Sequence, residues 1–406
     1  MLRCPSAAGA TRCLRASTEE LSGLLAASVA ALVGLGVLLN AGAIEVETAT
    51  WTKYNNNAPT NSDTTSTDGR LGLGNAATGD DGHVMFPSVL GGNPNRMWYV
   101  GHDGTTRRIY YATSPDGLTW TKYNNAIPAN SDTTSTDGRI PLGNNGRGDD
   151  NHLALTAVIV DEGIYKMWYS GYDSANYRIY YATSTNGTNW TKYNNVIPTN
   201  SDTTSTDGRI GLGTGNNGDT NMVAFPSVIK DGNTYKMWYT GQNGGTNCIY
   251  YATSPDGLTW TKYNNTIPTN SDTTSTDGRI PTGTAGNGDS RNASSATVIK
   301  VGSAYKMWYS GNDGANTRVY YATSPDGLTW TKHNNTIPAA SDTTSTDGRV
   351  PLGTSGRGDE TIAGVPAVIK VGNTYKLWYH GVDGSGKYRF YHAYSLPPAG
   401  MFLVTW

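Results

Sequence analysis

Residues 165–190 read YKMWYSGYDSANYRIYYATSTNGTNW, and this stretch decides the fold class. In Tyr165–Ser170 alternate side chains fall on opposite faces, which is typical of a β-strand. A turn rich in Gly and Asp leads to Arg178–Thr183, a run rich in Tyr and Ile, and a further turn leads to a strand that starts at Trp190. The apolar run 154–160 precedes them, so this part of the sequence predicts four short strands joined by turns.

The same unit recurs five times along the chain. Its most regular marker is the string SDTTSTDGR, which starts at Ser62, Ser131, Ser201, Ser271 and Ser341. The units cover about 51–119, 120–189, 190–259, 260–329 and 330–395. Four antiparallel strands per unit, repeated in this way, predict an all-β fold, a five-bladed β-propeller over residues 45–406. A linear solenoid is the alternative, but it would need polar capping repeats, and the sequence shows none.

The last unit lacks the Trp that would open its fourth strand, because Gly400 occupies that position. A closing strand could come from residues 45–54 at the N-terminal side or from Phe402–Trp406 at the other end. Either segment would hide the exposed edge of the last sheet by closing the ring. The sequence leaves both possibilities open.

Residues 1–44 differ in composition from everything that follows. Arg3, Arg12 and Arg15 precede Leu21–Ile44, a stretch of 24 residues without a charge, which ends in Ala41-Gly42-Ala43. A basic leader, an apolar stretch and small residues at the end predict an export signal peptide. The length would also suit an uncleaved membrane anchor, which would be the protein's link to a membrane. Both interpretations place the rest of the chain outside the cytoplasm, as a secreted or anchored extracellular protein.

Composition excludes several classes of protein. The chain has 406 residues, a net charge of −2, 15% charged residues and 50 glycines. So few basic residues argue against nucleic acid as a partner, and the Gly content argues against coiled coils. Cys248 is alone after the leader, so that part has no pair for an intrachain disulfide. The histidines are scattered, and SDTTSTDGR lacks the distal Glu of a calcium loop, so we expect neither a metal nor a cofactor.

A second motif, SPDGLTW, spans Ser114–Trp120 and recurs at Ser254 and Ser324. It resembles the Asp box of sialidase-type propellers, although it is one residue shorter. The Asp can accept backbone N–H bonds in a tight hairpin, and the Trp can wedge between blades. We therefore interpret this motif as structural.

The strings YKMWYSGYD at 165–173 and RIYYATSPDGLTW at 108–120 resemble the five-bladed propeller superfamily of glycoside hydrolases. This superfamily includes arabinanases, β-xylosidases, fructosidases, levansucrases and mannoside phosphorylases. The resemblance implies a carbohydrate partner and catalytic carboxylates at the positions where the innermost strands begin. Every unit has a Gly-Asp pair there, and an Asp that recurs in all of them is expected to cap a turn. These residues are Asp80, Asp149, Asp219, Asp289 and Asp359.

The next position differs between units, as catalysis with one protonated and one ionised carboxyl group requires. It holds Asp81, Asp150, Thr220, Ser290 and Glu360 in chain order. By resemblance, Asp81, Asp150 and Glu360 would be the catalytic residues: a base, an orienting Asp and a Glu acid. The alternative is that duplicated units drifted at an exposed position.

Two further positions diverge and are expected on the same face of the ring. His83 and His152 follow two residues later, while His102 and Tyr172 lie just after the glycine that ends strand two. Because antiparallel strands bring that turn back to the start of strand one, we expect these four side chains to bind substrate by stacking and hydrogen bonds. The first hypothesis is therefore a secreted glycoside hydrolase. The alternatives are a non-catalytic, multivalent glycan- or surface-binding propeller and a structural protein-binding platform.

Overall fold

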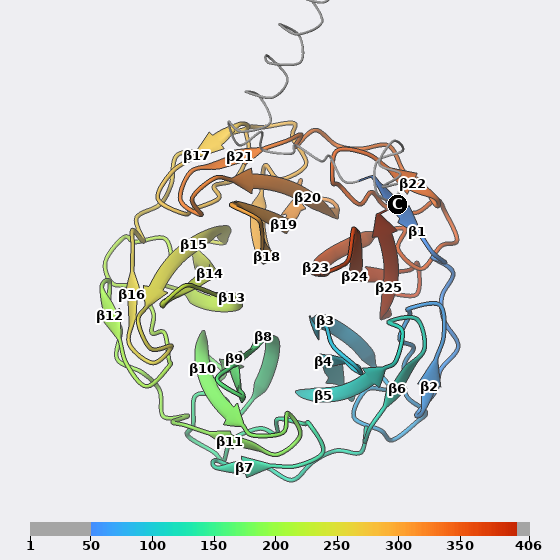
Figure 1. The fold of residues 1–406 in the computed structure, drawn as a ribbon, viewed down its shortest axis with the longest axis horizontal. Helices are drawn as coiled ribbons and strands as arrows, with labels where there is room; N and C mark the ends of the chain where they lie inside the picture. The colour runs from blue at the N-terminus through green and yellow to red at the C-terminus, as the bar shows by residue number, and fades with distance from the viewer. Residues whose placement is uncertain (1–49, 396–406) are drawn as a thin grey trace, which may run out of the picture. The chain divides into compact units, whose positions relative to one another are not determined.

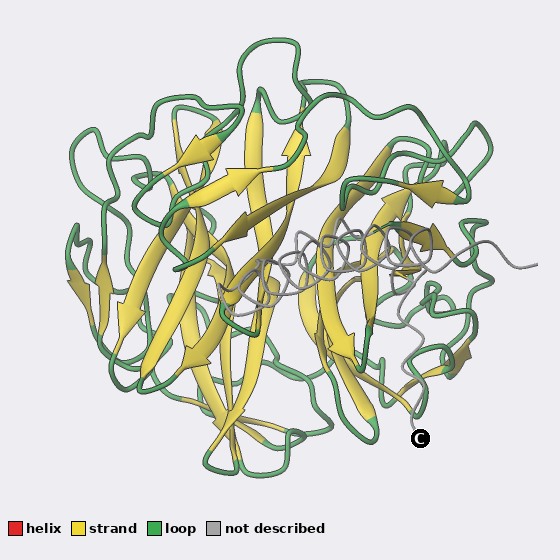
Figure 2. Ribbon diagram, turned by 45° about the horizontal axis from the view of Figure 1, so that its top comes forward, coloured by secondary structure: helices red, strands yellow, loops and turns green. Residues whose placement is uncertain are grey.

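The computed structural model describes residues 50–395, which form a ring of five β-sheets around a central channel (Figure 1). Within this range there are 25 strands and no helix (Figure 2). Consistent with this, no membrane-spanning helix is found among the described residues. The prediction of a five-bladed propeller is confirmed. The expected export signal or anchor lies outside the described residues.

Each blade has four antiparallel strands, numbered outward from the channel, and a short fifth strand at its outer edge. The four strands run in the order β3 (His83–Leu90), β4 (Asn95–His102), β5 (Arg107–Ser114), β6 (Trp120–Lys122) in blade 1; β8 (His152–Asp161), β9 (Ile164–Tyr172), β10 (Tyr177–Ser184), β11 (Trp190–Lys192) in blade 2; β13 (Met222–Asp231), β14 (Thr234–Asn243), β15 (Thr246–Ser254), β16 (Trp260–Lys262) in blade 3; β18 (Asn292–Val301), β19 (Ala304–Asn312), β20 (Thr317–Ser324), β21 (Trp330–Lys332) in blade 4; and β23 (Ile362–Val371), β24 (Thr374–Val382), β25 (Tyr388–Ser395), β1 (Trp51–Lys53) in blade 5. The outer strands are β2 (Thr65–Ser66), β7 (Thr134–Ser135), β12 (Thr204–Ser205), β17 (Thr274–Ser275) and β22 (Thr344–Ser345). These outer strands come from the SDTTSTDGR string, so that string is a structural turn and strand.

The N-terminal side of the propeller closes the ring. Strand β1 pairs antiparallel with β25, with Trp51 opposite Ser395, and also pairs with β22. Each innermost strand contacts the innermost strand of the next blade, and β23 contacts β3 in the same way. Of the two closing segments that the sequence allowed, the N-terminal one is therefore correct, while Phe402–Trp406 lies outside the described residues. A linear solenoid is excluded.

Tryptophan pairs join neighbouring blades. Trp98 of blade 1 meets Trp190 of blade 2 edge to face with ring centroids 5.8 Å apart, and Trp51 of the closing strand meets Trp308 of blade 4 at the same distance. Both geometries are the T-shaped arrangement that aromatic pairs prefer. In the Asp-box turn, Asp116 accepts hydrogen bonds from the N–H groups of Leu118 and Thr119, which confirms the structural interpretation of that motif.

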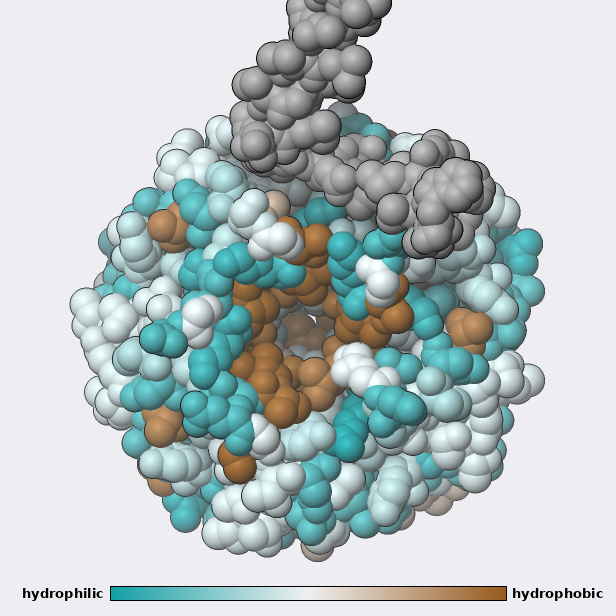
Figure 3. Space-filling view, viewed as in Figure 1, coloured by the Kyte–Doolittle hydropathy of each residue, from teal (hydrophilic) through white to brown (hydrophobic). Residues whose placement is uncertain are grey.

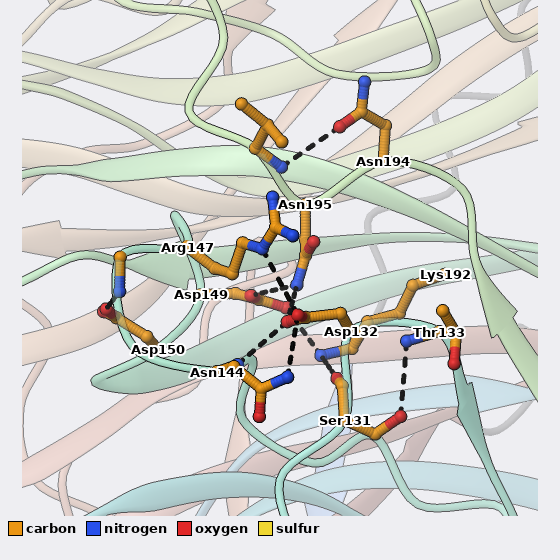
Figure 4. A network of polar contacts seen from close by, with 12 residues as sticks. Ser131, Asp132, Thr133, Asn144, Arg147, Asp149, Asp150, Lys192, Asn194 and Asn195 are labelled. Atoms are coloured by element: carbon orange, nitrogen blue, oxygen red, sulfur yellow. Dashed lines mark hydrogen bonds and ion pairs between the residues drawn. The ribbon is translucent and has the colours of Figure 1, made fainter.

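The repeated Gly-Asp carboxylates are buried structural residues. Asp149 forms an ion pair with Lys192 at 2.7 Å and accepts a hydrogen bond from Asn195 (Figure 4). It also accepts one from the Tyr169 hydroxyl. Its side chain is fully buried, as are its counterparts Asp80, Asp219, Asp289 and Asp359. Each counterpart has the same three kinds of partner. In blade 5 these partners include Lys53 and Asn56, so the buried network also fastens the closing segment.

Candidate functional site

The candidate site is the end of the central channel at which the innermost strands begin, here called the channel entrance. Antiparallel pairing places the first residue of each innermost strand opposite the last residues of the second strand, so His83 pairs with His102 and His152 pairs with Tyr172. The four predicted substrate-binding residues therefore lie as two cross-strand pairs, one on blade 1 and one on blade 2. All four are partly buried.

On blade 1 the two imidazole rings are stacked. The centroids of His83 and His102 are 5.1 Å apart and their planes differ by 9°. Tyr388, which begins β25 of blade 5, meets His83 edge to face at 5.2 Å, and its backbone N–H donates to the His83 Nδ1 at 3.3 Å. This row of rings therefore bridges the last and first blades.

Blade 2 carries a longer row of rings. His152 stacks on Tyr172 with centroids 5.8 Å apart, and Tyr172 stacks on Tyr177 with centroids 4.6 Å apart. Arg107 of blade 1 donates from Nη1 to the Tyr177 hydroxyl at 3.4 Å. The result is a stack of three rings with a guanidinium group beside its Tyr177 end, spanning two neighbouring blades.

Two phenylalanines face each other across the channel, which the sequence analysis missed. The rings of Phe86 in blade 1 and Phe225 in blade 3 lie 5.4 Å apart, although these blades are not neighbours. Both residues sit in β-bulges of the innermost strands, where φ is 59° for Phe86 and 55° for Phe225. A bulge re-aims side chains and breaks the strict alternation of a strand. The available signal was the Phe-Pro dipeptide, which occurs in these two units alone.

The histidines of the entrance favour their neutral form. Burial lowers the pKa of His83 to about 4, and the positive charges of neighbouring groups, among them Arg107, act in the same direction. Burial and the Arg107 guanidinium also lower the pKa of His102 and of His152. At neutral pH these rings are therefore uncharged aromatic surfaces whose nitrogens can donate or accept a hydrogen bond.

The three predicted catalytic carboxylates each hold the loop that precedes an innermost strand. Asp81 accepts a hydrogen bond from the N–H of Ala77 at 2.8 Å, and Asp150 accepts one from Gly146 at 2.7 Å (Figure 4). Glu360 does the same with Gly356 at 2.5 Å. Within residues 50–395 no hydrogen bond or ion pair joins any two of these three side chains. Their catalytic assignment remains a prediction.

The channel continues toward the opposite face as a cavity of about 880 Å³ that has both apolar and polar lining residues. Its wall consists mainly of Val, Ile, Ala and Pro from the innermost strands, and hydrophobic residues surround the central opening (Figure 3). Among the residues that line it, all in the described part of the protein, Asp116 of an Asp-box turn is the one with a carboxylate. The innermost strands also contribute hydroxyl groups to this wall, and lysines add positive charge, at Ser88, Thr156, Ser227, Thr297, Lys300, Lys370 and Lys376. In residues 50–395 no cluster of three or more His, Cys, Asp or Glu could hold a metal ion.

Solved structures share this fold. A glycoside hydrolase aligns with a TM-score of 0.57 and 17% identity over 86% of this chain and 93% of its own. A complex of BT0996 with RGII aligns with a TM-score of 0.57 and 17% identity over 87% of this protein and 93% of that one. A thermostable family-43 glycoside hydrolase gives 0.51 and 16% over 79% and 91% of the two proteins. This protein therefore has the five-bladed propeller fold of these glycoside hydrolases.

Sequence comparison finds relatives over a smaller part of the chain than the structural comparison does. Uncharacterized proteins from two strains of Mycobacterium tuberculosis are 36% identical over 115 residues, which is 27% of this chain and 33% of theirs. The match thus spans a third of the length of those relatives. No protein-family model matches the sequence.

Proposed function

We propose that this protein recognises carbohydrate at the channel entrance. The observation that carries the proposal is the continuous row of His152, Tyr172 and Tyr177 on blade 2, with Arg107 at its edge. Binding sites for small molecules are typically concave and aromatic, with a few polar groups that fix orientation. The channel entrance has aromatic rings with a few polar groups beside them, in a fold that glycoside hydrolases share.

The chemistry of a sugar ring suits such a surface. A pyranose has one face of C–H groups, which can pack on a flat aromatic ring, and hydroxyl groups at its edge, which need hydrogen-bond partners. The outer face of a terminal ring of the stack, His152 or Tyr177, supplies the flat area, and Tyr172 between them holds both rings in place. The Arg107 guanidinium and the neutral imidazoles supply donors and acceptors at the rim.

Hydrolysis is the second candidate, favoured by the position of Asp81, Asp150 and Glu360. These carboxylates precede the innermost strands of three adjacent blades, 1, 2 and 5, beside the rows of rings. In this mechanism Asp81 or Asp150 activates water for attack on the anomeric carbon, while Glu360 protonates the leaving oxygen. An inverting reaction requires carboxyl groups about 6.5–9.5 Å apart.

A panel of arabinan, xylan, fructan and mannosides tests both candidates with the full-length protein. Wild-type protein should bind at least one glycan, and Tyr172→Ala should weaken that binding at least tenfold. Tyr193→Ala is the matched control, because Tyr193 is exposed at the outer edge of blade 2 and should leave binding unchanged. Equal losses of glycan affinity in both variants, or no binding to any glycan of the panel, would contradict the proposed recognition site and favour a protein-binding platform.

The same panel separates binding from turnover. If the protein is a hydrolase, Glu360→Gln and Asp81→Asn should each lower the rate at least a hundredfold while glycan binding persists. Hydrolysis that survives both substitutions would remove these residues from the mechanism. Binding without product in the wild type would leave a non-catalytic glycan-binding propeller.

We also propose that residues 1–44 direct the propeller out of the cytoplasm, either as a cleaved signal or as an anchor. The support is compositional: a basic start, an uncharged stretch and Ala41-Gly42-Ala43 at its end. Cell fractionation with N-terminal sequencing of the exported protein distinguishes the two forms. Protein retained in the cytoplasm at full length would contradict the proposal.

A further inference from the structure

A second, smaller pocket of about 290 Å³ lies between blades 3 and 4, here called the blade 3/4 pocket. One wall comes from the second and third strands of blade 3, including Asn243, Cys248 and Tyr250. The other wall comes from the segment that leads into blade 4, including Thr282 and Arg291. None of these residues belongs to the rows of rings at the channel entrance.

The other four blades have different residues at the positions that form the blade 3 wall of this pocket. At the position of Cys248 they have an arginine, and at the position of Asn243 they have an aspartate. In each of them the two side chains form an ion pair: Arg108 with Asp103 at 2.7 Å, Arg178 with Asp173 at 2.5 Å, Arg318 with Asp313 at 2.8 Å and Arg389 with Asp383 at 2.7 Å. Blade 3 thus replaces a buried arginine by the smaller cysteine and its aspartate counter-ion by an asparagine of the same size, so both charges are lost.

The facing wall is altered at the same place. Thr282 stands where the other units have leucine, namely Leu73, Leu142, Leu212 and Leu352. Its hydroxyl donates to the Asn270 side-chain oxygen at 3.0 Å, so an apolar wall has become polar. One reduction in side-chain size from blade 3, at Cys248, and one from the unit of blade 4, at Thr282, therefore converge on a single pocket.

The turn between the second and third strands of blade 3 also differs from the turn in the other blades. In blade 2, Asp173 accepts hydrogen bonds from the next turn's N–H groups, at Ala175 and Asn176. In blade 3 the turn is Gly244-Gly245, with φ of 60° and 86°, and Asn243 pairs with Thr246 across it. Positive φ at both central residues is the conformation of a tight hairpin turn that favours glycine. The turn therefore no longer needs the aspartate.

The pocket wall contains polar groups that can form hydrogen bonds with a ligand. Tyr250 is 1% exposed and lines the pocket. The Cys248 thiol is also buried, and burial raises its pKa, so it stays protonated and can serve as a weak donor. A ligand that forms hydrogen bonds with these groups gains binding energy.

Charge narrows the class of ligand. Arg291 lines the pocket, while none of the lining residues, all of which lie in the described range, carries a carboxylate. Arg279, Lys332 and Asp289 also act on the Cys248 thiol electrostatically, but Arg279 is paired with Asp277 and Lys332 with Asp289, so their charges largely cancel and Arg291 decides the sign. A negatively charged group is therefore favoured here.

We propose that the blade 3/4 pocket binds a single acidic sugar ring, a monosaccharide unit that carries a carboxylate. The volume suits one ring rather than an oligosaccharide, since typical sites for larger ligands begin at about 300 Å³. The ring hydroxyls meet Tyr250, Thr282 and Asn243, and the carboxylate meets Arg291. The pocket is separate from the channel entrance, so this assignment does not depend on the function proposed there.

The experiment uses the full-length protein with Cys4→Ser and Cys13→Ser, so that Cys248 is the remaining thiol. Calorimetry should detect D-glucuronate binding with at least tenfold higher affinity than D-glucose binding. Saturating glucuronate should also slow modification of Cys248 by iodoacetamide at least fivefold. Equal affinity for the two sugars, or no glucuronate binding, would overturn the proposal.

The repeats themselves provide the matched variants. Cys248→Arg with Asn243→Asp and Thr282→Leu rebuilds the wall of the other blades, so it should fold with an unchanged melting temperature or a higher one and lose glucuronate binding at least tenfold. Tyr172→Ala, at the channel entrance, should leave that binding unchanged. Glucuronate binding that persists in the rebuilt variant, or that falls with Tyr172→Ala, would place the sugar elsewhere and contradict the assignment.

Discussion

Two regions of each blade can be compared: the buried network around the Gly-Asp carboxylate and the residues at the channel entrance. The residues of the network are the same in every blade, whereas those at the entrance differ. Every blade has the same buried Asp, Lys, Asn and Tyr, with the Asp–Lys pair at 2.7 Å each time. At the entrance, by contrast, the residue that begins the innermost strand is His83, His152, Met222, Asn292 or Ile362. Uniform positions therefore identify the parts that hold a blade together, and divergent positions identify surfaces that are free to recognise a ligand.

The strongest test of this comparison removes one buried ion. Lys192→Met leaves the Asp149 carboxylate buried without its counter-ion, which should cost about 3–5 kcal/mol of unfolding free energy. Arg147→Gln is the control, because the Arg147–Asp132 pair is partly exposed and should cost at most about 1 kcal/mol. Denaturant unfolding of the full-length protein measures both. Similar small losses in the two variants would show that the network does not hold the blade.

The closing blade should behave like an internal one. Trp51 and Trp190 are each 1% exposed and each pairs edge to face with a Trp of the preceding blade. Replacing either by Ala should therefore cost about 3–5 kcal/mol. The measurement is again denaturant unfolding. A loss below about 1 kcal/mol for Trp51→Ala alone would mean that strand β1 does not close the ring.

Much of this architecture could be predicted from the sequence because it repeats. The alternation in Tyr165–Ser170 and the period of the tryptophans determine the strands and the blades, and the recurring Asp at position 149 and its equivalents is structural as expected. Two segments could supply the closing strand according to the sequence analysis above. Trp51-Thr52-Lys53 repeats the WTK of the other fourth strands, and this signal favours the N-terminal segment.

The contacts at the channel entrance were harder to predict. Phe86 and Phe225 meet only because bulges turn them into the channel from blades that are far apart in sequence, and periodicity cannot show this. The four substrate-binding candidates were found by divergence between units, and the structure does bring them into cross-strand pairs. A catalytic role for Asp81, Asp150 and Glu360 depends on chemistry that no repeat pattern encodes.

The row of rings on blade 2 can be exchanged for the residues of blade 4. His152→Asn, Tyr172→Asn and Tyr177→Thr install the side chains found at Asn292, Asn312 and Thr317. Because blade 4 folds with these residues, stability should change by at most about 1 kcal/mol, while glycan affinity should fall at least tenfold, or about 1.4 kcal/mol. Thermal unfolding and binding are measured on the same sample. Unchanged affinity would mean that the divergence of this row has no part in recognition.

Acid should destabilise the protein before its carboxylates titrate. Burial lowers the pKa of His392 to about 3 from 6.5, so below pH 6.5 the unfolded protein takes up a proton that the folded protein excludes. The contribution of His392 to stability is therefore fully present above pH 6.5 and is lost progressively as the pH falls toward about 3. His392→Tyr, which installs the Tyr of the other blades, should reduce the loss between about pH 7 and pH 5. Identical pH dependence in the two proteins would contradict this account.

The smallest effect is expected at the loops before the innermost strands. Asp150→Ser installs the residue of blade 4 and removes the hydrogen bond from the N–H of Gly146, at a cost of about 0.5–1.5 kcal/mol. If Asp150 only holds its loop, glycan turnover, where present, should not change. A hundredfold loss of rate at nearly full stability would instead assign it to catalysis.

The most direct test of the central claim is a crystal structure of the protein with the tightest-binding glycan of the panel. The account predicts a sugar ring stacked on the outer face of Tyr177, with Arg107 at its edge. A glycan held instead at the exposed outer tyrosines, or in the channel cavity that opens toward the Asp-box turns, would contradict it.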